Sequence, residues 1–315
     1  METSKNNSRS VSKVLVLLAY CNGKKYINKQ VQSILAQKNV HVHTIILDDC
    51  SDKLSKNALM QFRNNPKISI LHSDRASGSA GQNFLKLIRK SNFTDYDFIA
   101  FSDQDDIWDK NKLTNAIKLI AKNNADAYSC SVTAFWEDGK TKLISQSSEI
   151  SDIDYLLEGA GQGCTFVMTS NFFEIVQRFC NENISLTKDF YYHDWLVYVI
   201  ARSMKFKWFF DKSSNMLYRQ HGSNDTGAKT SISSIINRLK LIQNGWYKNQ
   251  IILAIDISDR AHTSETKITT NFKELFNSKK SFQRRVLLTI LFLKNSRRKL
   301  TDRIVLVISA LLGWI

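Results

Sequence analysis

The chain has 315 residues, of which 43% are hydrophobic, and its 18 Phe, 10 Tyr and 6 Trp supply bulky core material. Together with a single proline, Pro66, this composition excludes a disordered or proline-rich protein. Five scattered cysteines without a C-x-x-C pair indicate neither a disulfide framework nor a zinc site. Because no apolar run reaches the ~20 residues of a membrane-spanning helix, we expect a globular protein of the cytoplasm.

The formal net charge of +15 is concentrated at the C-terminal end. Residues 229–315 hold 16 Lys and Arg against 5 Asp and Glu, a net of +11. Residues 1–228 hold 28 against 24, a net of only +4. A basic tail of this kind indicates an anionic partner, either lipid headgroups or nucleic acid.

Strands and helices alternate through the first part of the chain. Short apolar runs predict strands at 14–20, 41–47, 68–71 and 97–101. Apolar residues at helical spacing predict helices at 24–37, 55–64, 82–90 and 110–122. Repeated units of this kind predict an α/β protein with a mostly parallel sheet and helices on both faces.

The pattern changes after about residue 125. Strands are predicted at 127–135, 165–168 and 205–210, and an apolar helix at 195–204, which indicates a mixed half built onto the same sheet. Near the C-terminus two apolar runs, 286–293 and 304–315, are each too short to span a membrane. They are flanked by basic residues, Arg284, Arg285, Arg297, Arg298, Lys299 and Arg303. This pattern favours an interfacial membrane anchor, and the alternative is a helical pair packed on the enzyme or forming a dimer.

Acidic residues cluster where two of the predicted strands end. Asp103 and Asp105, with Gln104 between them and Asp106 behind, follow the strand at 97–101. Ligands of parallel sheets bind at these strand ends, and a D-x-D turn offers two carboxylates to Mg²⁺ or Mn²⁺. The alternative is that Asp106 or Asp109 caps the following helix. Asp48 and Asp49 follow the strand at 41–47 and could bind a nucleobase or ribose, or else cap a helix.

Two later motifs carry further candidates. Asp194 opens the apolar helix within Tyr-Tyr-His-Asp-Trp and could act as a general base if burial raises its pKa. It could equally be a helix cap, with His193 a structural histidine. Arg219 and His221, beside a glycine, could reach an anionic diphosphate, although an ordinary polar loop would read the same.

Taken together and in this order, the motifs resemble the family-2 glycosyltransferases of the GT-A fold, particularly the bacterial rhamnosyltransferase-like branch. The matching strings are LAYCNGKKYINKQVQSIL, LDDCSD, SGSAGQNF, FSDQDDIWDKNKL, GQGCTFVM, HDWLVYVIA and YRQHGSNDTGA. The resemblance implies a Rossmann-like GT-A domain over 1–230, with a nucleotide-sugar half at about 13–125 and an acceptor half at about 126–230. Residues 231–315 would form a basic helical extension that associates with a membrane.

The resemblance also implies the roles of individual residues. The expected donor-binding residues are Ala19, Tyr20, Asn22, Asp48, Asp49, Asn83, Asp103, Asp105, Arg219 and His221. Asp103 and Asp105 would bind the metal, Mg²⁺ or Mn²⁺, and Asp194 would be the catalytic base. The expected acceptor-binding residues are Gly163, Cys164, Thr165, His193 and Trp195. Cys21 stands where the family usually has an aromatic residue that packs on the nucleobase.

The implied activity is metal-dependent, inverting sugar transfer from a nucleotide sugar to a glycan or lipid-linked acceptor in cell-wall, capsule or O-antigen synthesis. The expected donor is dTDP-L-rhamnose, with a UDP-hexose as the alternative. The expected location is the inner face of the cell membrane, with a possible homodimer. A basic nucleic-acid-binding protein is the competing hypothesis, and it is disfavoured because the basic residues gather around apolar runs. A glycosidase with paired carboxylates would need neither metal nor nucleotide.

Overall fold

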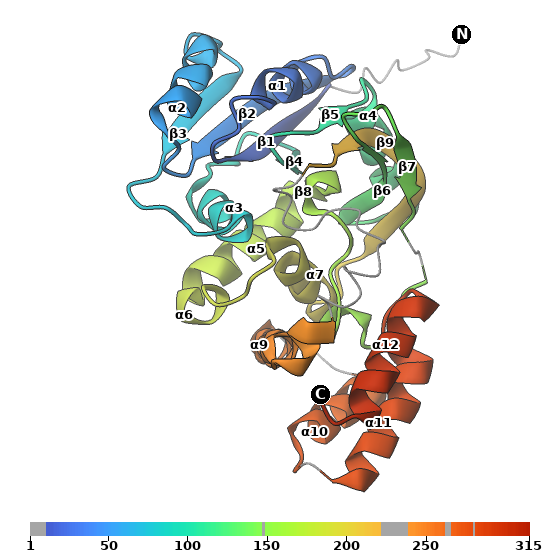
Figure 1. Ribbon diagram of the computed structural model, residues 1–315. Helices are drawn as coiled ribbons and strands as arrows, with labels where there is room; N and C mark the ends of the chain where they lie inside the picture. Colours follow the sequence, from blue (N-terminus) through green and yellow to red (C-terminus); the bar gives the residue numbers. More distant parts are fainter. Residues whose placement is uncertain (1–10, 147–148, 222–238, 262–265, 280) are drawn as a thin grey trace, which may run out of the picture.

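A computed structural model describes residues 11–146, 149–221, 239–261, 266–279 and 281–315 (Figure 1). The strands are β1 Ser12–Tyr20, β2 Val40–Asp48, β3 Ile68–His72, β4 Phe98–Ser102, β5 Ile107–Trp108, β6 Ala127–Phe135, β7 Thr141–Ile144, β8 Val167–Thr169 and β9 Trp208–Arg219. The α-helices are α1 Ile27–Leu35, α2 Lys53–Leu59, α3 Ala80–Lys90, α4 Lys112–Asn123, α5 Ser170–Glu182, α6 Ile184–Thr187, α7 His193–Ser203, α9 Trp246–Ala261, α10 Lys267–Asn277, α11 Phe282–Asn295 and α12 Leu300–Leu311. Three short 3₁₀ helices are η1 Met60–Phe62, η2 Asp154–Leu156 and η3 Gly163–Thr165.

The described strands form one sheet in the order β3-β2-β1-β4-β8-β6-β9-β5, with β7 paired to β6. The four strands predicted before residue 102 are all present and pair in parallel, as repeated βα units require. The second half adds β8 antiparallel to both β4 and β6, and β9 antiparallel to β5. The predicted α/β class with helices on both faces is therefore confirmed, and the antiparallel pairs come from the second half.

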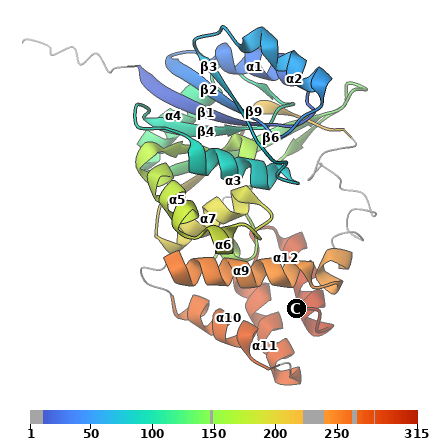
Figure 2. The same cartoon turned by 90° about the vertical axis from the view of Figure 1, so that its left-hand side faces the viewer.

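Strand β1 is buried on both faces because its side chains alternate between two apolar layers. Val14, Val16 and Leu18 pack in one cluster with residues of α1, α2 and α4. Leu15 and Leu17 pack in the other cluster, which includes residues of α3, α5 and α7. Figure 2 shows α1 and α2 above the sheet and α3, α5 and α7 below it. The described parallel strands are therefore the middle of three layers, with helices on both faces.

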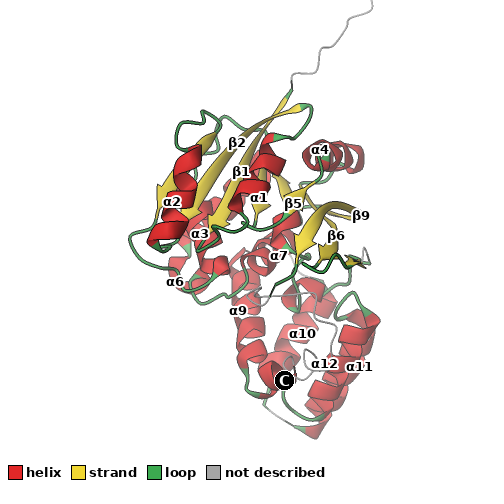
Figure 3. Ribbon diagram, turned by 45° about the horizontal axis from the view of Figure 1, so that its top comes forward, coloured by secondary structure: helices red, strands yellow, loops and turns green. Residues whose placement is uncertain are grey.

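Helices α9 to α12 form a helical unit beyond α7, at the end of the molecule away from β1–β3 (Figure 3). Ile251 of α9, Phe272 of α10 and Leu288 of α11 belong to the same apolar cluster as Leu17 of β1. The core therefore continues from the sheet into the C-terminal helices. The expected boundary at 230/231 lies outside the described residues and stays a prediction. Among the described residues, no helix is both long enough and apolar enough for a membrane span.

Candidate active site

Gln104 fastens the acidic turn after β4 to the end of β1. The backbone N–H of Cys21 donates to Gln104 Oε1 at 2.9 Å, and Gln104 Nε2 donates to the Cys21 carbonyl at 3.0 Å. Gly23 is required beside this clamp, because a Cβ there would lie 2.3 Å from Gln104 Oε1. Gln104, the central residue of the D-Q-D turn, therefore positions Asp103 and Asp105. Its side-chain amide is bonded to Cys21 and does not act as a ligand.

Asn83, near the start of α3, holds the ends of β1 and β2 together. Its Nδ2 donates to the carbonyls of Tyr20 and Leu47, both at 3.3 Å. The Tyr20 ring is buried and its hydroxyl donates to the Ser55 carbonyl at 2.8 Å. Tyr20 and Asn83 therefore hold the strand ends in place. The side chains of Tyr20 and its neighbour Ala19 are buried, so these residues face the site with their backbone.

Asn22 and Asp48 stabilise the two turns that follow these strands. Asn22 adopts a positive φ of 51°, and its backbone N–H donates to Ser51 Oγ at 2.9 Å. Asp48 accepts from the Ser51 N–H at 3.1 Å and lies 3.0 Å from His72 Nδ1. Its exposed fraction is 0%, so it has no surface open to a ligand. Asp48 therefore stabilises the turn that follows β2, and in this it differs from its neighbour Asp49.

Asp49 faces the loop before α3. It accepts two bonds from the Ser77 N–H at 2.9 and 2.8 Å and one from Ser77 Oγ at 2.7 Å. Lys86 Nζ lies 3.2 Å from the same carboxylate. The sequence analysis gave Ser77 and Lys86 no role, although Ser77 begins the matching string SGSAGQNF. Asp49 is only 5% exposed, so a ligand that binds it must share or displace the Ser77 contact.

The end of β9 closes over the acidic turn. His221 Nε2 lies 2.6 Å from Asp105 Oδ2, and Arg219 Nε donates to the Asp105 carbonyl at 2.7 Å. The Arg219 N–H also donates to Asp106 Oδ1 at 3.1 Å. The ring of Tyr26 stacks on His221 with centroids 5.1 Å apart and lies 4.7 Å from the Arg219 guanidinium. Tyr26, which the sequence did not single out, therefore supports both basic residues.

Asp103, Asp106 and Cys164 bring potential ligand atoms within 4.8 Å of one another. Burial, and then the charges of Asp105 and Asp103, raise the pKa of Asp106 well above its usual range. Burial, and then the charge of Asp106, raise the pKa of the Cys164 thiol. Carboxylate oxygens are ligands that Mg²⁺ and Mn²⁺ prefer, whereas a thiol is not. Asp103 and Asp106 are thus the potential oxygen ligands of this cluster, and the Asp105 carboxylate beside them lies against His221.

Two consecutive residues of η3 join this acidic turn to the start of α7. A Cβ on Gly163 would lie 2.4 Å from His193 Nε2 and 3.2 Å from Asp194 Cβ. The next residue, Cys164, is the one that approaches Asp103 and Asp106. Acids from the turn after β4 and from the start of α7 thus border the same short segment, η3. Thr165 is buried, and its hydroxyl donates to the Gln162 carbonyl at 2.7 Å, so it holds the 3₁₀ turn.

Asp194, the expected general base, lies in the first turn of α7. Burial raises the pKa of its carboxyl to about 6, against the opposing effect of backbone N–H groups such as that of Trp195, 2.7 Å from Oδ1. A base with a pKa near the working pH is ionised and still able to accept a proton. Burial lowers the pKa of His193 to about 3, so its imidazole is neutral at physiological pH. The ring stacks on Phe84, with ring centroids 3.9 Å apart. Trp195 is fixed by its indole N–H, which donates to the Tyr155 carbonyl at 2.8 Å.

An aromatic cluster lies immediately before α7. Tyr191 and Tyr192 contact each other edge to face at 4.7 Å, and both contact Trp246 of α9, at 5.7 and 5.9 Å. All three side chains are partly exposed. Gln250 ties the two elements together, because its Oε1 accepts from the Tyr191 N–H at 2.9 Å. The sequence analysis did not connect Trp246 with Tyr191 and Tyr192, because Trp246 lies in the C-terminal extension.

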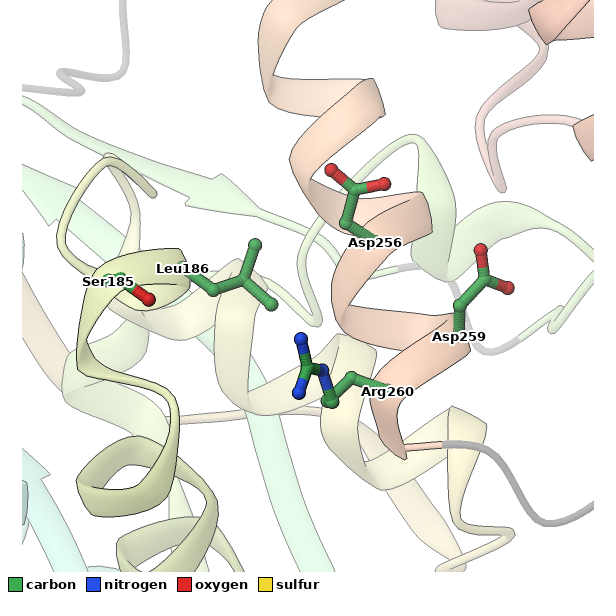
Figure 4. Close-up of a pocket in the computed structure, with 5 residues that line it drawn as sticks. All are labelled: Ser185, Leu186, Asp256, Asp259 and Arg260. Carbon is green, nitrogen blue, oxygen red and sulfur yellow. The ribbon is translucent and has the colours of Figure 1, made fainter.

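An open hollow of about 660 Å³ lies elsewhere, between α6 and α9 (Figure 4). It is lined by Ser185, Leu186, Asp256, Asp259 and Arg260, and Figure 4 shows both acids on α9. Its three α9 residues lie several turns from Trp246, and none of the five lining residues belongs to the acid-rich site. The hollow is therefore separate from the strand-end site, where the chemically suited side chains meet.

Sequence comparison agrees with this geometry. The profile of the family described as Glycosyl transferase family 2 matches residues 15–184, which is more than half of the chain. The chain belongs to glycosyl transferase family 2. It is 38% identical over 236 residues to the dTDP-rhamnosyl transferase RfbG of Shigella flexneri, covering 74% of this chain and 82% of that protein. This family-2 chain is therefore a glycosyltransferase of the rhamnosyltransferase-like kind.

A more distant relative matches about half of this family-2 glycosyltransferase. The UDP-Glc:alpha-D-GlcNAc-diphosphoundecaprenol beta-1,3-glucosyltransferase WfgD of Escherichia coli is 30% identical over 163 residues, 49% of this chain and 59% of that protein. Among solved structures, S. aureus TarS 1–349 with UDP aligns with a TM-score of 0.51 and 15% identity, over 89% of this chain and 80% of that chain. At this identity the likeness concerns the fold alone, and the expected GT-A fold is confirmed.

Proposed function

We propose that this enzyme transfers L-rhamnose from dTDP-L-rhamnose to a glycan or lipid-linked acceptor in cell-wall, capsule or O-antigen synthesis. The donor is supported by the 38% identity to a dTDP-rhamnosyl transferase over 74% of the chain. A lipid-linked acceptor is supported by the more distant relative whose acceptor is a diphosphoundecaprenol-linked sugar. A UDP-hexose is the second candidate donor, because that same relative uses UDP-Glc.

The single observation that carries the mechanism is the position of η3. Gly163 borders Asp194 and Cys164 borders Asp103 and Asp106, which supports one site shared by the proposed base and the acidic turn that carries the proposed metal ligands. The donor diphosphate would lie against Asp103, Asp105, Arg219 and His221. The nucleobase would lie near Asp49, between the ends of β1 and β2. The acceptor would enter beside Gly163, His193 and Trp195.

In the proposed reaction Asp194 removes the proton from an acceptor hydroxyl while that oxygen attacks the anomeric carbon. The new C–O bond forms as the bond from the anomeric carbon to the diphosphate breaks, and the nucleoside diphosphate leaves. One displacement inverts the anomeric configuration and needs no covalent enzyme intermediate. Mg²⁺ or Mn²⁺, held by Asp103 and Asp105 when bound, would supply neutralising charge for the leaving diphosphate. Arg219 and His221 add positive or donor groups on the same side.

The donor proposal is tested with a panel of dTDP-L-rhamnose, UDP-glucose and UDP-GlcNAc in the presence of Mn²⁺. We expect dTDP-L-rhamnose to raise the melting temperature most, because only a bound ligand stabilises the folded state by mass action. We also expect release of dTDP that increases with added membrane extract as acceptor. Stabilisation and turnover with a UDP-hexose alone would replace rhamnose by that sugar, and turnover with none of the donors would refute the function.

We further propose that the enzyme works at the inner face of the cell membrane, in contact with an anionic lipid surface through residues 284–315. This location would bring it to a lipid-linked acceptor. A homodimer through the same helices is the competing arrangement.

A further inference from the structure

Helices α11 and α12 expose many large apolar side chains. They are Phe282, Val286, Leu287, Ile290, Leu293, Leu300, Ile304, Ile308, Leu311 and Leu312. Phe282 is 82% exposed and Leu300 is 67% exposed. Among the described residues before 280, exposed side chains of this kind are scattered singly along the chain. Ten within 31 residues form a concentration that soluble surfaces rarely carry without a partner.

The spacing places these residues on one stripe of each helix. In α11 they recur at 282, 286, 290 and 293, and in α12 at 300, 304, 308 and 311. Residues four and then three positions apart share a helix face. The opposite faces carry the buried residues, such as Leu288 and Phe292 of α11 and Leu306 of α12. Each helix therefore has one apolar face packed on the protein and a second one open.

Several arginines of this region, which the sequence pattern assigns to an interfacial anchor, are bonded to the protein itself. Arg284 is buried and donates to three carbonyls, those of Leu275 at 2.9 Å, Phe276 at 3.0 Å and Ile315 at 3.1 Å. Arg303 Nε donates to the Arg297 carbonyl. These guanidinium groups satisfy carbonyls at the ends of helices, where positive charge is also favourable.

Arg298 docks the α11–α12 pair onto the catalytic unit. Its Nη1 lies 2.8 Å from Asp154 Oδ2, and its backbone N–H donates to Glu158 Oε1 at 2.6 Å. Asp154 also binds Arg202 of α7 at 2.6 Å. Because this network is buried, the open apolar stripes are held in a fixed position relative to α7 and the site at its start.

The charges of this region favour lipid over a second copy of the chain. Residues 281–315 contain seven Lys and Arg but one acid, Asp302, which lies 3.9 Å from Arg297. Lys294 and Lys299 are exposed next to the stripes. A two-fold dimer through this surface would bring lysines against lysines, since such an interface pairs a patch with itself. An anionic membrane complements both the apolar stripes and the lysines.

We propose that the exposed stripes of α11 and α12 form a lipid-binding face that inserts its apolar side chains among acyl chains, with Lys294 and Lys299 at the headgroups. This inference makes the proposed membrane location more specific. It rests on the proposed function only in that a lipid-linked acceptor gives the enzyme a reason to bind a membrane. Binding by insertion differs from a purely electrostatic attachment, because apolar contacts resist added salt.

The test is flotation of the full-length protein with vesicles of phosphatidylethanolamine and phosphatidylglycerol, at low and at high salt. We expect wild-type protein to float with the vesicles under both conditions. The double variant Ile290→Glu/Ile308→Glu should bind at least about tenfold more weakly, because two inserted side chains are lost. The matched control is Leu54→Glu/Leu143→Glu, which changes two exposed residues outside this face and should float like wild type.

Melting curves and dTDP release without vesicles show whether each variant is folded and active. Equal vesicle binding by wild type and Ile290→Glu/Ile308→Glu would overturn the proposal. So would the absence of wild-type binding, and a concentration-dependent dimer that this double variant breaks would then assign the face to a second copy. Vesicle binding without turnover of any nucleotide sugar would leave the lipid-binding face in place and refute the proposed function alone.

Discussion

His221 Nε2 lies 2.6 Å from Asp105 Oδ2, although 116 positions separate the two residues in the sequence. The contact depends on the antiparallel pairing of β5 with β9, in which Ile107 lies opposite Leu217 and Trp108 opposite Met216. This pairing brings the residues just after β9 to those just before β5. Asp105 and the basic residues at the end of β9 therefore form one connected unit.

Removing divalent ions should abolish transfer. Chelation with EDTA should reduce turnover to background, and Mn²⁺ or Mg²⁺ should restore it. Asp105→Asn should raise the Mn²⁺ concentration for half-maximal activity by at least about tenfold, because it removes one ionised ligand. A matched Asp138→Asn variant, which changes an exposed acid of the β6–β7 turn, should behave like wild type. Full activity in EDTA would refute the metal requirement.

Replacing Asp194 should stabilise the fold at neutral and higher pH. The folded-state pKa of this acid is raised to about 6, from 3.8, by burial, so ionising it costs folding free energy as the pH rises through this range. Asp194→Asn removes that cost and should gain about 1–3 kcal/mol at pH 8, and nothing below pH 3.8. Urea denaturation at both pH values measures the difference. Equal stability at pH 8 would show that the carboxyl is not desolvated.

Gly163→Ala should damage the site without removing any functional group. The added Cβ would lie 2.4 Å from His193 Nε2 and 3.2 Å from Asp194 Cβ, so the start of α7 must shift. A displacement of about 1 Å can cost about 10²-fold in rate, and we expect a loss of kcat of that order. Adding His193→Ala should recover part of the lost stability by making room. Unchanged kcat and melting temperature in Gly163→Ala would contradict this packing.

Asp154→Asn should destabilise the protein strongly. The Asp154 carboxylate accepts from Tyr198, Arg202 and Arg298 at 2.6 to 2.8 Å, and its loss leaves two buried guanidinium groups without their counter-charge. Breaking a buried ion pair costs about 3–5 kcal/mol, which urea denaturation would show as a large fall in the midpoint. The exposed pair Lys140–Asp138 is the control, and Lys140→Ala should leave the midpoint unchanged. A small effect of Asp154→Asn would show that the network is dispensable.

The sequence predicted best what local patterns determine. Buried strands β1, β2 and β4 read as continuous apolar runs because helices cover both of their faces, and acids at their ends stood out against those runs. The Gln104 clamp could not be predicted, since it depends on the spacing of β1 and β4 and not on any local pattern. Nor could the inward direction of Arg284 and Arg298, because the carbonyls and acids that they bind come from distant segments.

The central claim is that Asp194 takes the proton from the acceptor hydroxyl and is not needed for binding the nucleotide sugar. The most direct measurement is dTDP-L-rhamnose turnover by wild type and Asp194→Asn, with the donor affinity of both proteins measured by calorimetry in Mn²⁺. We predict that Asp194→Asn loses about 10²- to 10⁴-fold in kcat while its donor Kd stays close to that of wild type. Near-normal turnover by Asp194→Asn would contradict the account.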